Sequence, residues 1–223
     1  MSQPNANKTP VVIVEDHPMF RERLAELINR EPDLSICGEA DNIRDGFELI
    51  TRGDAKVAII DITLQGSSGL ELLKSLKAAS AEVPVLVLSM HDESLYAQRV
   101  LRAGARGYIT KSEASAKIMT ALRQVVAGEI YLSSKMATKL LGQLADGCDA
   151  TSGMDRLTDR EMEVFHRIGS GQNTREISAT LGLGAATVET YRARIKDKLQ
   201  LENAARLQQE AVRWVQTLER DAA

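Results

Sequence analysis

The sequence is poor in the features that mark secreted, zinc-binding and membrane-spanning proteins. Its two cysteines, Cys37 and Cys148, lie far apart and match no metal-ligand spacing, so neither a disulfide framework nor a zinc site is indicated. No apolar run approaches the length of a membrane span, and the polar residues 2–10 are unlike a signal peptide. We therefore expect a soluble cytoplasmic protein that has no membrane partner.

An overall excess of positive charge is also absent, because the formal net charge is −3. Any binding to nucleic acid would therefore depend on a local basic stripe. The content of hydrophobic residues is 43%, which is enough for a packed core and excludes a disordered protein. The length of 223 residues predicts one large domain or two domains of ordinary size.

Five short strand-like runs alternate with segments of helical periodicity between residues 10 and 129. Most of the runs are continuously apolar, which is typical of strands buried on both faces of a parallel sheet. This alternation predicts an α/β fold, a five-stranded doubly wound parallel sheet with right-handed crossovers. The predicted strands lie at residues 11–14, 34–40, 57–61, 84–89 and 107–110.

Several segments are predicted to lie outside this sheet. We expect residues 1–9 to form a disordered tail and residues 66–69 to form a loop. Residues 130–153 are interpreted as a linker that contains a helical segment at 133–145. Within the sheet domain, Cys37 is interpreted as a small buried hydrophobic residue.

Residues 154–223 predict a second, smaller all-α domain. Thr158 and Glu161 have the spacing of a capping box at the start of its first helix. Two further helices, at about 173–181 and 186–199, are joined by a glycine turn, and the second carries basic residues. This pattern is typical of a helix-turn-helix motif.

Polar side chains stand where the predicted strands end, the edge at which open α/β sheets bind ligands. Three carboxylates at one edge would repel one another unless a cation lay between them, and hard oxygen ligands suit Mg²⁺. A carboxylate beside Mg²⁺, a hydroxyl and an ammonium group is a competent acceptor for a phosphoryl group. The residues concerned are Glu15, Asp16, Asp61, Ser89 and Lys111.

These strand-end residues resemble those of the receiver domain of two-component response regulators, which has a flavodoxin-like fold. The resemblance extends over residues 10–129 and includes the Gly107-Tyr108 pair before Lys111. Residues 157–161, 173–177 and 186–191 resemble a LuxR-type DNA-binding domain. In this order the two domains are similar to the NarL/FixJ branch of response regulators.

The resemblance implies a phosphorylation site and its metal. Asp61 would be phosphorylated by a partner, a sensor histidine kinase. Asp16 and Asp61 would bind Mg²⁺ directly, Glu15 would bind it through water, and the backbone carbonyl of Thr63 would complete the protein ligands. The sequence departs from the family at Gln65, where a proline is usual, and at Glu15, where the family usually has aspartate.

The resemblance also implies how phosphorylation would act. Ser89 and Lys111 would engage the phosphoryl group, and the rotamer of Tyr108 would report it. The output would be formation of a homodimer and binding to double-stranded DNA at paired half-sites. The protein would then be no enzyme, apart from loss of its own phosphoryl group to water.

The predicted recognition helix combines basic residues with a polar N-terminal end. The basic residues would contact phosphates, although their spacing spreads them around the helix so that not all can touch DNA at once. Base edges would be met by the N-terminal residues, among which Glu189 can accept from cytosine N4 but repels phosphate. The basic residues are Arg192, Arg194, Lys196 and Lys198, and the N-terminal residues are Thr187, Glu189, Thr190 and Ala193.

Other interpretations compete with these. Asp61 could simply cap the next helix and have no chemical role. His17 is interpreted as a residue of the first helical turn. Tyr108 could be a half-buried aromatic residue of an edge strand. The stripe of Leu207, Trp214 and Leu218 could form a dimer contact or could pack on its own domain.

Two rival functions are also considered. An Asp- and Mg²⁺-dependent phosphohydrolase of the haloacid-dehalogenase type would have a second aspartate two residues after the first, where this chain has Thr63. A phosphorylation-independent regulator would use the fold for protein contacts alone. The complete acidic site argues against that second alternative.

Overall fold

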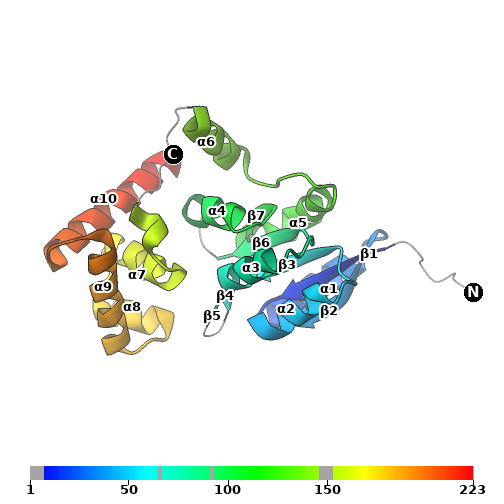
Figure 1. Cartoon of the computed structure of the whole chain (residues 1–223), viewed down its shortest axis with the longest axis horizontal. Coiled ribbons are helices and arrows are strands. Elements are labelled where there is room, and N and C mark those ends of the chain that lie inside the picture. The colour runs from blue at the N-terminus through cyan, green and yellow to red at the C-terminus, as the bar shows by residue number, and fades with distance from the viewer. Residues whose placement is uncertain (1–7, 65–66, 91–92, 146–152, 223) are drawn as a thin grey trace, which may run out of the picture. The chain divides into compact units, whose positions relative to one another are not determined.

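The computed structural model describes residues 8–64, 67–90, 93–145 and 153–222, which divide between two compact units (Figure 1). The units are Met1–Gly142 and Gln143–Ala223. Of the tail predicted at residues 1–9, residues 1–7 lie outside the described part of the chain. Thr9 is not part of a tail, because it is the first residue of strand β1, Thr9–Val14.

A five-stranded parallel sheet forms the centre of the first unit. The strand order is β2-β1-β3-β6-β7, so the chain winds outward from β1 in both directions. This order confirms the doubly wound α/β fold predicted from the sequence. The central strand β3 is buried along its whole length, as its run of apolar residues predicts. After β1, the strands of this sheet are β2 (Leu34–Ala40), β3 (Val57–Asp61), β6 (Val85–Ser89) and β7 (Gly107–Thr110).

Helices cover both faces of the sheet because successive side chains of each strand point to opposite faces. On one face, α1 and α5 contribute Ile28 and Ile118 to a single hydrophobic cluster. On the other face, a Cβ at Gly46 of α2 would lie only 2.8 Å from Val14, so this helix packs closely on β1. The helices are α1 (Pro18–Asn29), α2 (Ile43–Thr51), α3 (Gly69–Ala78), α4 (Glu93–Arg102) and α5 (Lys111–Val126).

The segment after β3 differs from the loop predicted at residues 66–69. Two short antiparallel strands, β4 (Thr63–Leu64) and β5 (Ser67–Ser68), form there, and Gly69 begins α3. A Cβ at Gly69 would lie 2.0 Å from the carbonyl oxygen of Asp61, so this close approach requires glycine. Two-residue strands leave no periodicity in a sequence, which is why the prediction missed them. Gln65 lies outside the described residues.

The prediction that Cys37 is buried is wrong. Its side chain is exposed, because β2 is an edge strand of the sheet and is less covered than the central strands. Cys148 lies outside the described residues.

The chain after α5 first pairs with the edge of the sheet. Tyr131 forms a parallel bridge with Gly107, and the Tyr108 N–H donates to the Tyr131 carbonyl at 3.0 Å. In return, the Tyr131 N–H donates to the carbonyl of Arg106 at 2.9 Å. The start of the predicted linker is therefore an extension of the sheet at β7.

The helical segment predicted within the linker is α6, Ser134–Ala145. The division between the two units falls inside this helix. Residues 146–152 lie outside the described part, and a short 3₁₀ helix, Gly153–Arg156, precedes the helices of the second unit. The domain boundaries expected after residues 129 and 153 stay predictions.

Four α-helices follow the 3₁₀ helix in the described part of the second unit, which agrees with the all-α domain predicted from the sequence. Capping boxes begin α7 at Thr158 and α8 at Asn173, and each supplies a hydrogen-bond acceptor to an otherwise unpaired helix N–H. Gly182 ends α8 in the left-handed conformation, with φ of 64°, which allows the tight turn into α9. The helices are α7 (Asp159–Gly169), α8 (Thr174–Leu181), α9 (Ala185–Leu199) and α10 (Ala204–Ala222).

The apolar stripe of α10 packs within its own unit. Leu207 and Val215 are buried, and the ring of Trp214 lies 5.5 Å from that of Phe165 of α7. Of the two roles considered for this stripe, packing on its own helices is therefore the one found. Within the described residues, no helix is both long enough and apolar enough to cross a membrane.

Candidate functional site

The register of the sheet brings the predicted strand-end residues to one edge. Val14 pairs with Ile60, so Glu15 follows β1 beside the position at which Asp61 ends β3. Ser89 ends β6, and Lys111 begins α5 directly after β7. All four of these polar side chains are almost completely buried: the residue exposures of Glu15, Asp61 and Ser89 are 0%, 1% and 0%, and the Lys111 side chain is 6% exposed.

Lys111 joins the two buried carboxylates. Its Nζ lies 2.7 Å from Oε2 of Glu15 and 2.8 Å from Oδ2 of Asp61. The ring of Phe20 on α1 lies beneath the ammonium group, with its centroid 4.8 Å from Nζ. The ammonium is thus held between an apolar ring and two acceptors, which orients it toward Asp61.

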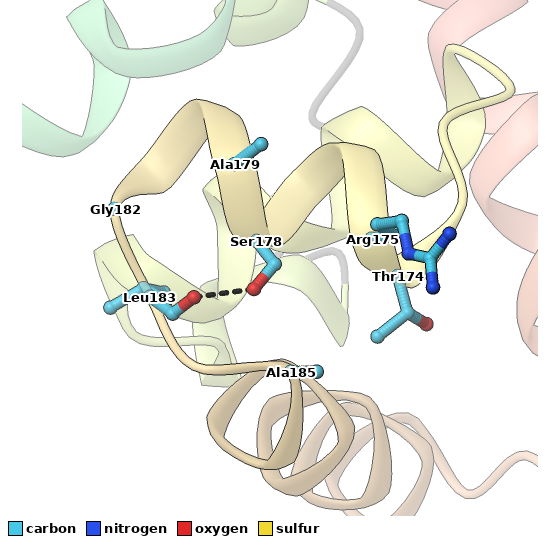
Figure 2. Close-up of a pocket in the computed structure, with 7 residues that line it drawn as sticks. All are labelled: Thr174, Arg175, Ser178, Ala179, Gly182, Leu183 and Ala185. Carbon is cyan, nitrogen blue, oxygen red and sulfur yellow. Dashed lines mark hydrogen bonds between the residues drawn. The ribbon is translucent and has the colours of Figure 1, made fainter.

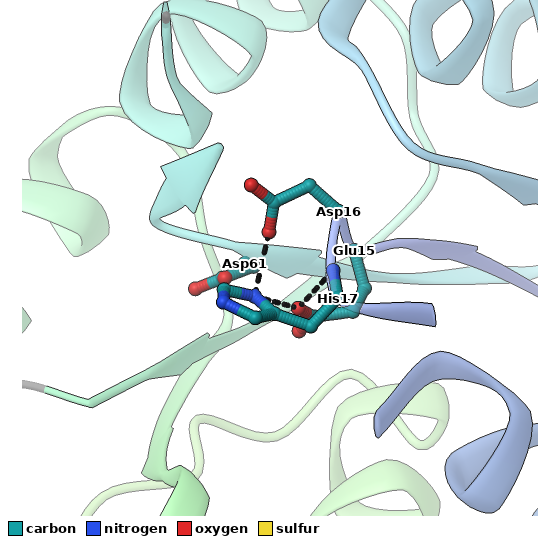
Figure 3. Close-up of side chains that lie close together, drawn as sticks. All are labelled: Glu15, Asp16, His17 and Asp61. Carbon is teal, nitrogen blue, oxygen red and sulfur yellow. Dashed lines mark hydrogen bonds and ion pairs between the residues drawn. The ribbon is translucent and has the colours of Figure 1, made fainter. Parts of the chain in front are cut away.

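An acidic cluster forms around the end of β1 (Figure 3). One ligand atom from each of Glu15, Asp16, His17 and Asp61 lies within 4.8 Å of the others. Nδ1 of His17 lies 2.9 Å from Oε1 of Glu15 and 2.8 Å from Oδ1 of Asp16. The donor set fits a divalent cation, because such cations prefer oxygen ligands and three carboxylates converge here. Two of these carboxylates are nearly fully buried.

His17 and Phe20 belong to this site although the sequence interpretation gave neither a role there. His17 was expected to be a helix-start residue, and it is the N-cap of α1. Its side chain, however, turns back onto the acidic pair. The His-Pro sequence after two acidic residues was the signal available, since Pro18 at the first helical position fixes where His17 stands.

Burial raises the pKa of Asp61 to about 6, and the charge of Glu15 adds to this effect. The Lys111 ammonium and a hydrogen bond from the Thr63 N–H, 3.1 Å from Oδ1 of Asp61, act in the opposite direction. Burial alone would lower the pKa of Lys111, but its attraction to Asp61 and the hydrogen bonds to both carboxylates raise it above its usual value. Two carboxylates therefore share one ammonium, and a further cation would be stabilised here.

Tyr108 lies next to this edge in β7. The residue is 1% exposed, so the alternative that it is a half-buried aromatic of an edge strand is wrong. Its backbone N–H is paired with the carbonyl of Tyr131, in the segment that bridges to β7. The sequence pattern gives no indication of that bridge.

A second candidate surface is the exposed side of α9. Val188 and Ile195, seven residues apart, are fully buried and fix the inward side of the helix. Arg192 is largely covered, with 17% of its side chain exposed. Lys196 is partly exposed, and the predicted contact residues that are exposed are Thr187, Glu189, Thr190, Ala193 and Arg194.

Lys198 differs from the other basic residues of α9 because it is paired with a residue of α7. Its Nζ donates to Oε2 of Glu161 on α7 at 2.6 Å, and Glu161 is 1% exposed. The fourth basic residue of the predicted stripe is thus engaged in the packing of its own unit. This agrees with the expectation that the four basic residues cannot all reach DNA at once.

A pocket of about 590 Å³ lies where α8 meets the turn before α9 (Figure 2). The Ser178 hydroxyl donates to the carbonyl of Leu183, which holds this turn closed. Thr174 lines the pocket and also donates to Glu189, so pocket and exposed side of α9 form one surface. The lining residues are Thr174, Arg175, Ser178, Ala179, Gly182, Leu183 and Ala185.

Comparison with known proteins assigns a family to each part of the chain. Residues 11–123 match the response regulator receiver domain, and residues 155–212 match the bacterial regulatory proteins of the luxR family. The first match covers the sheet and the acidic edge. The second covers α7 to α9 and the start of α10.

Known regulators match this chain over almost the whole of their own length. Transcriptional regulatory protein UhpA of Salmonella typhimurium is 34% identical over 197 residues, which cover 88% of this chain and 94% of that protein. Response regulator UvrY of Escherichia coli is 28% identical over 203 residues, covering 91% and 93%. The crystal structure of a LuxR-family two-component response regulator from Aurantimonas sp. is 27% identical and matches with a TM-score of 0.57, covering 62% of this chain and 99% of that one.

The family predicted from the strand-end residues and the helix-turn-helix pattern is thereby confirmed. The chain belongs to the NarL/FixJ family of response regulators, in which a receiver domain precedes a LuxR-type DNA-binding domain.

Proposed function

We propose that this response regulator carries a phosphoryl group on Asp61 and that the modification controls transcription through DNA binding. The observation that carries the proposal is the position of Lys111, whose Nζ lies 2.8 Å from Oδ2 of Asp61 and 2.7 Å from Oε2 of Glu15. A buried ammonium beside the acceptor oxygen neutralises the charge of a transferring phosphoryl group. No activity on other substrates is proposed, and the phosphoryl group would leave only by hydrolysis.

The proposed donor is a sensor histidine kinase. An oxygen of Asp61 forms a bond to phosphorus while the bond from phosphorus to the donor's imidazole nitrogen breaks. The Thr63 N–H, which already donates to Oδ1, orients the carboxylate for this step. The Ser89 hydroxyl, at the end of the neighbouring strand, would donate to one phosphoryl oxygen, and the Lys111 ammonium would pair with another.

We propose that Mg²⁺ is the metal of this site. Asp16 and Asp61 would bind it directly, the backbone carbonyl of Thr63 would be a third ligand, and Glu15 would bind through water. When bound, Mg²⁺ neutralises the charge on the acceptor and phosphoryl oxygens. The indirect role of Glu15 is supported by its existing contacts, since its two carboxylate oxygens already face Lys111 and His17.

Phosphorylation would control dimerisation and DNA binding through residues at the ends of β6 and β7. A phosphoryl group adds about −1.5 to −2 charges, which would draw Ser89 and Lys111 inward and favour a different rotamer of Tyr108. Reversing a two-state population requires about 5.5 kcal/mol of differential stabilisation. The shifted state would form a homodimer that binds two half-sites of double-stranded DNA.

The DNA-binding face would be the exposed side of α9. Its N-terminal residues would meet base edges in the major groove, and its basic residues would contact phosphates. The residues proposed for base edges are Thr187, Glu189, Thr190 and Ala193, and those for phosphates are Arg192, Arg194 and Lys196.

Labelling with acetyl phosphate in the presence of Mg²⁺ tests the phosphorylation site. We expect Asp61→Asn to lose the label, while Asp54→Asn, an exposed residue of the same unit, retains it. Footprinting on the protein's own promoter region should show that the phosphodonor increases protection of the DNA by the wild type. The phosphodonor should have no such effect with Asp61→Asn. Equal labelling of Asp61→Asn would refute the assignment. A wild type that binds DNA but neither Mg²⁺ nor phosphate would indicate a phosphorylation-independent regulator.

A further inference from the structure

We infer that Glu189 is a base-specificity residue that selects cytosine in the major groove, with Thr174 as its positioning residue. The inference rests on the proposed binding of α9 to DNA. Glu189 lies near the N-terminal end of α9, where the residues of a recognition helix meet base edges, and 61% of its side chain is exposed. A carboxylate at this place is repelled by phosphates, so it lowers affinity unless a donor group of the DNA faces it.

The carboxylate of Glu189 is fixed at one of its two oxygens. The Thr174 hydroxyl, on the first residue of α8, donates to Oε1 at 2.6 Å, and Nε of Arg192 lies 3.8 Å from the same oxygen. Within the part of the chain that the structure describes, no hydrogen bond to Oε2 is found. One oxygen is therefore anchored across the helix-turn-helix, and the other is available to a ligand. Because the rotamer is already held, binding through Oε2 costs less side-chain entropy.

The chemistry of an ionised carboxylate restricts which base it can face. It accepts hydrogen bonds and donates none, so it needs an amino group of a base. In the major groove, cytosine N4 and adenine N6 are donors, whereas guanine and thymine present acceptors at their base edges. Adenine also places the acceptor N7 beside its amino group, which would repel the carboxylate. Cytosine is therefore the base that Glu189 fits best.

Arg192 determines how much charge Glu189 presents. Its side chain is 17% exposed and its Nε lies 3.8 Å from Oε1 of Glu189, so it partly neutralises the carboxylate. The pair then acts as a unit in which Arg192 limits repulsion from the DNA backbone while Glu189 reads the base. Replacement of Glu189 by glutamine keeps the shape, removes the charge and adds a donor, and glutamine pairs with adenine N6 and N7.

Selection of duplexes from a pool of random sequence tests this inference with the full chain treated with acetyl phosphate. In the wild type we expect one cytosine position in each half-site. In Glu189→Gln the preference for cytosine at that position should be lost or replaced by a preference for adenine. The affinity for cytosine relative to the other bases should change by about tenfold. Thr174→Val should weaken the preference at the same position, and Thr174→Ser, which keeps the hydroxyl, should restore it. Glu202→Gln, the same charge change at an exposed residue beyond α9, should leave the site unaltered.

An unchanged site for Glu189→Gln would overturn the inference and leave Glu189 as a contact between α8 and α9 only. The fluorescence of Trp214, the single tryptophan, verifies that each variant is folded before selection. A wild type that enriches no sequence at all would refute the proposed DNA binding as well, so the two failures are distinguishable.

Discussion

Lys198 of α9 donates a hydrogen bond of 2.6 Å to Glu161 at the start of α7, 37 residues earlier in the sequence. The Glu161 carboxylate also accepts a hydrogen bond from the Thr158 N–H, and the residue is 1% exposed. A buried carboxylate without its cation costs free energy. This ion pair therefore couples the C-terminal end of α9 to the start of α7.

Lys198→Met should destabilise the DNA-binding unit by about 1.5–3 kcal/mol, because it leaves Glu161 buried without its charged donor. Denaturant unfolding of the full chain, followed by the fluorescence of Trp214, measures this unit selectively. Its ring lies 5.5 Å from that of Phe165, and the chain has no other tryptophan. The control Arg213→Met breaks an exposed pair with Glu210 and should cost less than about 0.5 kcal/mol. Equal effects of the two substitutions would contradict the role of Lys198.

The same pair predicts a dependence of stability on pH. Burial acts to raise the pKa of Glu161, but hydrogen bonds from Lys198 and Thr158 outweigh it and hold the pKa below its usual value. A carboxyl group with a lower pKa in the folded state stabilises the fold above its unfolded pKa, near 4.5. This stabilisation is lost as the pH falls through the folded-state pKa. The decline below about pH 4.5 should be smaller in Lys198→Met than in the wild type.

In the absence of metal, the ionisation of Asp61 changes folding stability with pH in the opposite direction. Its pKa is raised from 3.8 to about 6, so the unfolded state gives up its proton first as the pH rises. Stability is therefore lost between about pH 4 and pH 6 and stays reduced above that. In a chelator at pH 8, Asp61→Asn should be more stable than the wild type by about 1–3 kcal/mol, and the gain should shrink toward pH 4.

Calorimetry of the receiver unit in the full chain measures this difference, with Asp54→Asn as an exposed control. Addition of Mg²⁺ should reverse the order, because the cation stabilises the ionised wild-type site and has one carboxylate fewer to bind in the variant. An Asp61→Asn protein that is less stable than the wild type in chelator at pH 8 would show that the lysine attraction outweighs the burial of Asp61.

A substitution at Gly69 tests the steric requirements of the same site. A Cβ at this position would meet the carbonyl oxygen of Asp61 at 2.0 Å, so Gly69→Ala must displace either the start of α3 or the end of β3. We expect a loss of about 2 kcal/mol or more in the stability of the receiver unit and weaker labelling of Asp61. Gly142→Ala, in a helix where an added Cβ meets no atom within 4 Å, should leave both unchanged.

The strand-end residues could be predicted because the physical cause is local. A continuous apolar run such as Val57–Asp61 must be buried on both faces, and a charged residue at its end must then stand at the edge of the sheet. Parallel strands bring such ends together, so Glu15, Asp61 and Lys111 could be grouped without coordinates. Local patterns also gave the capping box, from the spacing of Thr158 and Glu161, and the helical second domain, from its glycine turn between two short helices.

The roles of His17 and Lys198 could not be predicted because they depend on tertiary packing. The sequence places His17 directly after the acidic pair, but no periodicity records that its ring turns back onto both carboxylates. Lys198 lies in a run of basic residues, and a run alone does not tell which side chain meets Glu161 on another helix. The packing of α9 on α7 separates Lys198, which is paired, from Arg194, which is exposed.

Arg194 is the basic residue of α9 that is exposed, whereas Arg192 is largely covered and Lys198 is paired. If Arg194 contacts a phosphate, Arg194→Ala should weaken binding to specific and random duplexes equally. The slope of log affinity against log salt concentration should become less steep by about one unit. Titrations of both duplexes over a range of salt concentrations measure this slope. Arg213→Ala, an exposed arginine on α10, should leave it unchanged. If Arg194→Ala changed specific binding alone, Arg194 would contact a base and not the backbone.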